Sequence, residues 1–266
     1  MTKLAVLDDL LRSYRRVLVA FSGGADSAFV LAAAVRALGP DAVVAATAVS
    51  PSLAETELAE ARAFAAGLGV EHRTPRTHEM ERPGYAANAG DRCYFCKSEL
   101  LDTLAPLADG AVVCTGTNAD DAAAGFRPGI RAAAERGART PLLDAGLTKA
   151  EVREASRAWG LPTWDKPAAA CLASRVAYGI AITPRRLARV ERAEADARAW
   201  LAEHGIGVRD LRVRDLGDAA RVEVDAELVG AVAGIEGAVR GWAAVTVEPF
   251  RSGSMNELLP DPDRYR

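Results

Sequence analysis

The sequence predicts an α/β protein with a doubly wound parallel sheet, followed by a smaller C-terminal α+β domain. Apolar runs rich in β-branched residues, such as 17–21 and 42–49, alternate with helix-forming stretches. This alternation is typical of βαβ units and a parallel sheet. From about residue 176 the pattern changes to apolar residues alternating with charged ones, which is typical of antiparallel strands. We therefore expect one domain over residues 1–178 and a second over 179–266.

The first domain is expected to supply its elements in a regular order. The first 16 residues read as an amphipathic helix, and the stretch 75–91 reads as a long, partly helical loop. Residues 127–139 are rich in Arg and Gly and are expected to be irregular. Thr148 and Glu151 form a capping-box pattern that predicts a helix from Lys149. The other predicted elements are strands at 17–21, 42–49, 70–74 and 111–115 and helices at 27–38 and 53–68.

The second domain is expected to begin with a long helix. Thr183 and Pro184 form a helix-start signal, and Gly205 and Gly207 predict its end near His204. The remaining predicted elements are half-buried antiparallel strands at 208–214 and 221–224, a short helix from residue 226 and a last strand at 243–247.

Composition excludes several classes of function. The chain has 266 residues, half of them hydrophobic, and a net charge of −3, which argues against a general nucleic-acid binder. No targeting segment and no apolar run of membrane length is visible. Four cysteines without a secretory signal favour metal or redox chemistry over a disulfide framework. We expect a cytoplasmic protein.

The turn SGGADS, residues 22–27, joins the first predicted strand to the next helix. Two adjacent glycines let a ligand approach bare backbone, and the helix directs its first N–H groups at the turn, so we expect a phosphate cradle. It lacks the spacing and the lysine of a Walker P-loop. It resembles the pyrophosphate loop of the ATP α-hydrolase superfamily, in which Asp26 would help to hold magnesium; the alternative is that Asp26 only caps the helix. The residues expected to hold the nucleotide here are Ser22, Gly23, Gly24, Asp26 and Ser27.

A second glycine-and-carboxylate turn, GTNADD at 116–121, follows the predicted strand 111–115. It is expected to face the same crevice, outside the carboxyl ends of the strands. Gly116, Asn118 and Asp120 are predicted to contact the nucleotide. Asp120 and Asp121 can serve magnesium or the nucleotide, or act as helix caps.

The cysteines divide into three groups. Cys93 and Cys96 form a CxxC pair, which alone is a weak signal for metal or redox chemistry. Cys114 lies in an apolar strand and is expected to be a small buried hydrophobe. Cys171 has Arg175 one helical turn away, so a cation can favour its thiolate; the alternative is a core cysteine.

Five motifs in order, SGGADS, DRCYFCK, GTNADD, GLPTWDKPAAACLASR and LRVRDLGDAARVEV, resemble the ATP-dependent sacrificial sulfur transferase family, the LarE family, over essentially the whole chain. The resemblance implies a pyrophosphate-loop α/β domain, a smaller C-terminal domain and often a homo-oligomer. It also implies synthesis of the thiocarboxylates of pyridinium-3,5-bisthiocarboxylic acid mononucleotide. That compound is the precursor of the nickel-pincer cofactor of lactate racemase.

The resemblance implies roles for the cysteines. Adenylation of the substrate carboxylate by ATP would be followed by attack of sulfur, with Cys171 in the position of the family's donor cysteine and Lys97 placed to neutralise developing charge. Some members give up the sulfur of that cysteine and are left with dehydroalanine. Others hold a [4Fe-4S] cluster on three cysteines, and for this chain we expect the cluster form, with Cys93, Cys96 and Cys171 as ligands.

The pyridinium mononucleotide carries a phosphate. Arg212 and Arg214 lie two residues apart on one face of a predicted strand and match the family's phosphate-binding motif, and Arg175 is expected to join them. The alternative is a solvated, charged strand face.

Three other functions share part of this pattern. A tRNA thiolase has the same loop and sometimes three cysteines, but from residue 176 onward acidic residues outnumber arginines and lysine is absent, which disfavours RNA binding. An ammonia-using synthetase leaves the cysteines without a role. A zinc-stabilised nucleotide-binding module would be no enzyme at all. We expect no nucleic-acid or membrane partner.

Overall fold

The computed structural model describes residues 1–123, 128–167 and 170–259 and divides them into two compact units. The first unit comprises residues 1–79 and 93–167, and the second comprises 80–92 and 170–259. The segment 80–92 thus packs with the C-terminal part of the chain. In the described residues, no helix is both long and apolar enough to cross a membrane.

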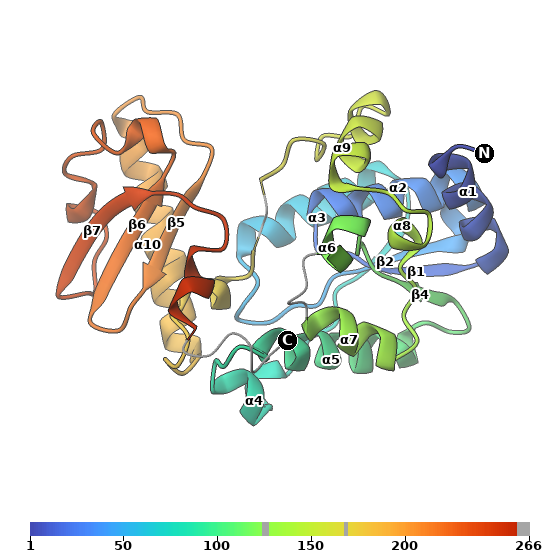
Figure 1. Ribbon diagram of the computed structural model, residues 1–266, viewed down its shortest axis with the longest axis horizontal. Helices are drawn as coiled ribbons and strands as arrows, with labels where there is room; N and C mark the ends of the chain where they lie inside the picture. The colour runs from blue at the N-terminus through green and yellow to red at the C-terminus, as the bar shows by residue number, and fades with distance from the viewer. Residues whose placement is uncertain (124–127, 168–169, 260–266) are drawn as a thin grey trace. The chain divides into compact units, whose positions relative to one another are not determined.

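The first unit holds a four-stranded parallel sheet in the order β3-β2-β1-β4, which confirms the predicted α/β fold (Figure 1). Its strands are β1 (Val17–Ala20), β2 (Val43–Ala46), β3 (Glu71–Arg73) and β4 (Val112–Cys114). Its helices are α1 (Lys3–Tyr14), α2 (Ala25–Leu38), α3 (Glu55–Gly67), α5 (Arg92–Leu104), α6 (Ala119–Ala123), α7 (Pro128–Glu135), α8 (Pro141–Asp144) and α9 (Lys149–Ala158). Short 3-10 turns lie at Pro40–Ala42 and Ala105–Leu107, and another, Glu79–Glu81, at the end of the unit's first segment.

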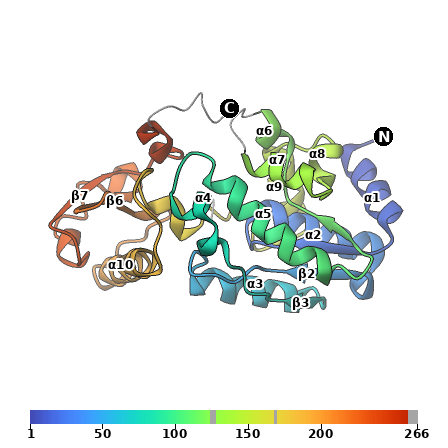
Figure 2. The same ribbon diagram turned by 90° about the horizontal axis from the view of Figure 1, so that it is seen from below.

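Helices cover both faces of this sheet, as Figures 1 and 2 show. Val17, Val19 and Phe21 face a large core formed with α1, α2, α3 and α9, and α2 lies beside α9. Leu18 and Ala20 face the other side, where they form a smaller cluster with α5. Because alternate strand residues point to opposite faces, the all-apolar run 17–21 is explained by burial on both sides.

The region 127–139 differs from its prediction. The described part of it contains α7, a helix of eight residues that buries Ala132 and Ala133. The helix packs beside α5: Tyr94 donates a hydrogen bond to Glu135, and Arg136 pairs with Asp102 at 2.7 Å. Arg131, one of the arginines that indicate an irregular segment in the sequence, lies on the exposed face of this helix, and Arg136 and Arg139 follow its end. Residues 124–127 lie outside the described part of the chain.

The second unit is built on the long helix α10 (Pro184–Glu203), as predicted from the Thr183 cap, which accepts a hydrogen bond from the Arg186 N–H. The helix packs on a three-stranded sheet of β5 (Leu211–Asp215), β6 (Ala219–Val224) and β7 (Ala244–Pro249). β5 and β6 are antiparallel, as expected, whereas β7 is parallel to β6. The short helix predicted from residue 226 is a 3-10 turn, Ala226–Leu228; others are Leu172–Arg175, Ile235–Gly237 and Ser254–Leu258.

The segment 80–92 carries α4 (Pro83–Ala86) and is joined to the second unit by Asn88. The Asn88 amide donates to the carbonyls of Ala177 and Ile180, at 2.8 and 2.9 Å. Arg92 donates to the Ala173 carbonyl at 3.0 Å. These contacts fix the backbone that follows Cys171.

Candidate active site

The turn between β1 and α2 has the backbone of an anion cradle. Gly24 is the N-cap of α2 and no side chain caps this helix, so the first N–H groups of α2 are not used by a side chain of the turn. Gly23 has φ +77°, a conformation that side chains rarely adopt. Asp26 and Ser27 lie in the first turn of α2, which begins two residues earlier than predicted. The helix-cap interpretation of Asp26 is therefore wrong.

The hydroxyl groups of Ser22 and Ser27 close this turn. Their oxygens lie 3.1 Å apart, the Ser22 N–H donates to Ser27 Oγ at 3.2 Å, and Ser27 Oγ donates to the Gly24 carbonyl at 3.1 Å. The two serines thus fix the shape of the cradle from inside.

Gly116 brings the second turn against the first. A Cβ placed on Gly116 would lie 2.7 Å from the Ser27 nitrogen, 2.9 Å from its Cα and 3.0 Å from the Asp26 carbonyl carbon. All three are backbone atoms at the start of α2, so no side chain can be accommodated there. The two turns therefore lie in contact, and a crevice that both of them face stays a prediction.

Asp26 lies where the two turns meet. Its Oδ1 is buried without a hydrogen-bond partner among the described residues. Burial raises the pKa of Asp26 above its ordinary value, and Asp121 adds to the rise, while Lys149 and a hydrogen bond from Asn118 oppose it. A carboxylate oxygen left without a donor is the kind of ligand that Mg²⁺ takes beside substrate phosphates.

The other residues of the second turn have structural partners. Asn118 is buried, and its side chain and that of Asp121 bond each other's backbone N–H at the start of α6. Asp120 accepts from the Lys149 N–H at 2.8 Å, at the start of α9. The helix-cap interpretation thus holds for Asp120 and Asp121, and nucleotide binding by Asp120 stays a prediction.

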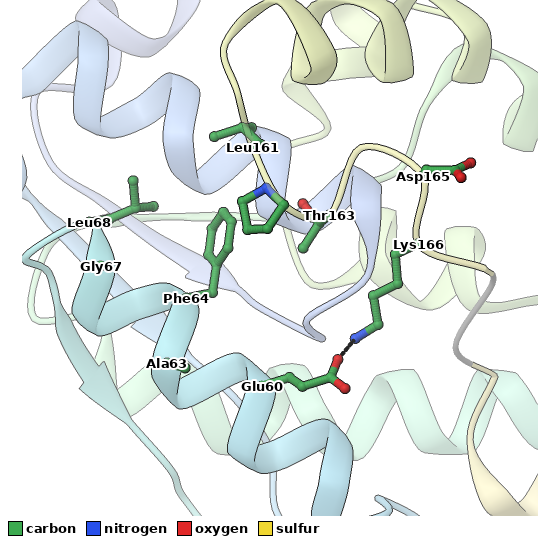
Figure 3. A pocket seen from close by; sticks show the side chains of 10 residues that line it. Glu60, Ala63, Phe64, Gly67, Leu68, Leu161, Thr163, Asp165 and Lys166 are labelled. Atoms are coloured by element: carbon green, nitrogen blue, oxygen red, sulfur yellow. Dashed lines mark hydrogen bonds and ion pairs between the residues drawn. The ribbon is translucent and has the colours of Figure 1, made fainter. Parts of the chain in front are cut away.

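Lys166 is a residue that sequence reasoning did not place in the site. Its ammonium donates to the Gly23 carbonyl at 3.2 Å and to Glu57 and Glu60 of α3, each at 2.7 Å. Figure 3 shows the contact with Glu60. One signal was available: only four lysines stand among 33 basic residues.

A cavity of about 720 Å³ lies beside Lys166, between α3 and residues 161–166. Its wall is mostly apolar, with Phe64, Leu68 and Leu161, and its polar end carries Glu60, Asp165 and Lys166 (Figure 3).

Cys93 and Cys96 lie one turn apart on α5, and neither is buried. Lys97 follows them; desolvation lowers its pKa, although Cys96 opposes this. Cys114 is fully buried, and burial raises the pKa of its thiol to about 12, so it is the small hydrophobe that was predicted. In the described part of the chain no three His, Cys, Asp or Glu side chains are grouped to hold a metal ion, and the cluster stays a prediction.

Cys171 belongs to the second unit and is exposed at the start of the 3-10 turn 172–175. Arg175 donates to the carbonyls of Cys171, at 2.9 Å, and Ala170, and it pairs with Glu194 at 2.9 Å. Its guanidinium therefore orders the backbone around Cys171.

Arg212 and Arg214 are buried, with 6% and 5% of their surface exposed, so the solvated strand face is wrong. Arg214 pairs with buried Glu223 at 2.7 Å. Burial lowers the pKa of Arg212, and the nearby charges of Arg175 and Arg214 lower it further. The guanidinium groups of Arg175, Arg212 and Arg214 thus lie together, and the charges of Glu194 and Asp210 partly offset their mutual repulsion. Buried guanidinium groups in one place suit an anion.

The parallel sheet, the open N-terminus of α2 and the unpartnered Asp26 oxygen define an enzyme of the pyrophosphate-loop class that uses ATP. Comparison with known proteins agrees. The NAD synthase family matches residues 6–85. The chain is 42% identical to the uncharacterized protein slr1717 of Synechocystis sp., over 97% of this chain and 98% of that protein.

The chain is also 33% identical to the pyridinium-3,5-bisthiocarboxylic acid mononucleotide synthase of Lactiplantibacillus plantarum, over 97% of this chain and 95% of that protein. It therefore belongs to the family of this synthase, the LarE family of sulfurtransferases.

Proposed function

We propose that this enzyme uses ATP to adenylate a carboxylate of pyridinium-3,5-biscarboxylic acid mononucleotide and then replaces AMP by sulfur. The product is the thiocarboxylate, in the synthesis of the nickel-pincer cofactor. The observation that carries the proposal is the cradle at residues 22–27 with the orphaned Asp26 oxygen, in a chain that aligns with the named synthase almost from end to end.

The first step suits the residues of the cradle. A carboxylate oxygen of the substrate attacks the α-phosphorus of ATP, the bond to the bridging oxygen breaks, and pyrophosphate leaves with the electron pair. Backbone N–H groups at the start of α2 stabilise the charge that gathers on the departing group. A Mg²⁺ ion held by Asp26 would neutralise part of the same charge.

The second step needs a sulfur nucleophile. Sulfur attacks the acyl carbon, and AMP leaves with the electron pair of the carbon–oxygen bond. Cys93, Cys96 and Cys171 are proposed to hold a [4Fe-4S] cluster. The iron left without a cysteine ligand would carry a hydrosulfide taken from solution, so sulfur would be supplied without consuming a cysteine. None of the three cysteines is buried, and the first two lie one turn apart on α5, which supports this choice. Lys97 is proposed to neutralise the developing charge. The alternative source is Cys171 itself, whose Cβ–Sγ bond would break to leave dehydroalanine.

The substrate phosphate is proposed to bind Arg212, Arg214 and Arg175. The support is the grouping of three buried guanidinium groups, whose mutual repulsion a phosphate dianion would relieve.

The proposal keeps the division of labour predicted from the sequence. Residues 1–178 would adenylate the substrate and carry the cysteine site, and 179–266 would bind its phosphate and support a homo-oligomer in the cytoplasm. Nucleic-acid binding is not expected, because the second domain has no lysine and more acidic than basic residues.

The test is turnover of anaerobically purified protein with MgATP, the pyridinium substrate and sodium sulfide. We expect pyrophosphate and AMP to form with the thiocarboxylate. AMP that forms with ammonia and no sulfur would establish the ammonia-using synthetase instead, and salt-sensitive tRNA binding would favour the thiolase. Mass spectrometry of the protein then identifies the sulfur source. Intact Cys171 after repeated turnover supports the cluster, and loss of one sulfur from Cys171 contradicts it.

A further inference from the structure

We propose that Lys166 is a positioning residue that locks the pyrophosphate turn in its anion-binding conformation and ties it to the segment that leads to Cys171. This inference rests on the proposed function, because it concerns the same nucleotide site. It assigns a role to a side chain that would touch neither the nucleotide nor the sulfur.

The contacts of Lys166 use its whole donor capacity. An ammonium has three N–H groups, and Lys166 has three acceptors: the Gly23 carbonyl at 3.2 Å and the carboxylates of Glu57 and Glu60 at 2.7 Å. Its side chain is 14% exposed. With two carboxylates beside it, the ammonium presents no net positive charge to a phosphate. The geometry therefore favours a clamp on the turn over a phosphate ligand.

The hydrogen bond from Lys166 to the Gly23 carbonyl fixes the orientation of the peptide plane between Gly23 and Gly24. The Gly23 carbonyl and the Gly24 N–H belong to the same planar, trans peptide and point in opposite directions. While Lys166 holds the carbonyl, the Gly24 N–H points away from Lys166 and donates to Ser22 Oγ at 3.4 Å. Rotation of this plane would exchange the directions of the two groups, and a carbonyl oxygen would repel phosphate. Glycines on both sides of the plane make such a rotation sterically easy, so the turn needs a clamp.

The two glutamates keep the clamp charged. Burial by itself lowers the pKa of an ammonium, but the hydrogen bonds that Lys166 donates to Glu57 and Glu60 leave its pKa above the ordinary value. The same α3 helix also packs directly on the turn: a Cβ on Gly23 would lie 3.5 Å from Ala61 Cβ. Lys166 thus fastens the turn to a helix that already contacts it.

The backbone of Lys166 is held as well. Arg153 of α9 donates to the Lys166 carbonyl at 3.2 Å. Lys166 stands five positions before Cys171 in the sequence, so the segment that carries the donor cysteine starts from an anchored point. The Lys166 side chain thus connects the pyrophosphate turn to the start of this segment.

The experiment compares two full-length variants with the wild-type protein. Lys166→Met removes the ammonium and keeps the length of the side chain. Lys3→Met makes the same change at another ion-paired lysine of the same unit, which bonds Glu151 at 2.8 Å away from the turn. MgATP affinity is measured by calorimetry, and hydrogen–deuterium exchange is followed across residues 22–28.

We expect Lys166→Met to weaken MgATP binding by about tenfold or more, the effect of losing a hydrogen bond from a charged donor. Exchange across 22–28 rises in Lys166→Met and not in Lys3→Met. Lys166→Arg, which can still donate to the Gly23 carbonyl, recovers most of the affinity. Should Lys166→Met fail to fold, Glu57→Gln carries the same expectation of weaker MgATP binding.

Unchanged MgATP affinity and unchanged exchange in Lys166→Met overturn this inference while leaving the proposed function intact. Wild-type protein that binds MgATP but forms no AMP with the pyridinium substrate overturns the proposed function, and the role of Lys166 is still read from binding and exchange.

Discussion

Replacement of Gly116 by alanine tests whether the two turns must touch for the site to form. The added Cβ would lie 2.7 to 3.0 Å from three backbone atoms of Asp26 and Ser27, whereas ordinary contacts begin near 3.4 Å. The backbone of α2 has little room to move, because most of this helix is buried in the core. Overpacking of this kind costs about 1–3 kcal/mol, which lowers Tm by about 2–10 °C in a chain of this size.

The added Cβ would push on the backbone at the start of α2 and so move the N–H groups of the cradle. We therefore expect MgATP affinity to fall by about tenfold or more. The assays are a thermal melt and calorimetric titration of MgATP. Gly67→Ala is the matched control, because its Cβ meets nothing within 4 Å and its backbone is helical. A Gly116→Ala protein that matches Gly67→Ala in both Tm and affinity would refute the reasoning.

Three further predictions follow from burial and charge. Burial raises the pKa of Asp26, and only its carboxylate form binds Mg²⁺, so the rate of pyrophosphate release should rise with pH through that elevated pKa. In a pH–rate profile, Asp26→Asn should abolish this rise and lower the rate by about a hundredfold. Arg212→Met should raise KM for the mononucleotide by about tenfold and leave KM for the dephosphorylated nucleoside unchanged, and Tm should fall little because Arg175 and Arg214 already repel Arg212. Equal effects on the KM of both substrates would exclude phosphate binding by Arg212. Cys114→Ala should lower the free energy of unfolding by about 1 kcal/mol in a denaturant titration and leave sulfur transfer unchanged. Loss of sulfur transfer in a folded variant would contradict the assignment of Cys114 as a core residue.

The parallel sheet and the pyrophosphate turn were predictable because their signals are local. The run 17–21 is apolar at every position, and the glycines of the turn follow it directly. Arg212 and Arg214 were placed correctly on one strand face by their spacing of two. Their burial was not predictable, since it depends on Glu194 and Glu223, which bring compensating charge from other elements.

Lys166 escaped prediction for the same reason. Its partners Gly23, Glu57 and Glu60 stand 143, 109 and 106 positions away in the sequence, and no periodic pattern connects them. The helix α7 was missed because the Arg and Gly content of 127–139 was given more weight than the three consecutive alanines at 132–134, which favour a helix. Local sequence propensity predicts individual helices and strands well, whereas contacts between elements distant in the sequence depend on the tertiary fold.

Transfer of oxygen from substrate to nucleotide tests the central claim most directly. The pyridinium substrate is labelled with ¹⁸O in its carboxylates, and the AMP released during thiocarboxylate formation is analysed by mass spectrometry. Adenylation of the carboxylate places one ¹⁸O atom in the phosphate of each AMP. AMP that forms alongside the thiocarboxylate but carries no label would contradict the account.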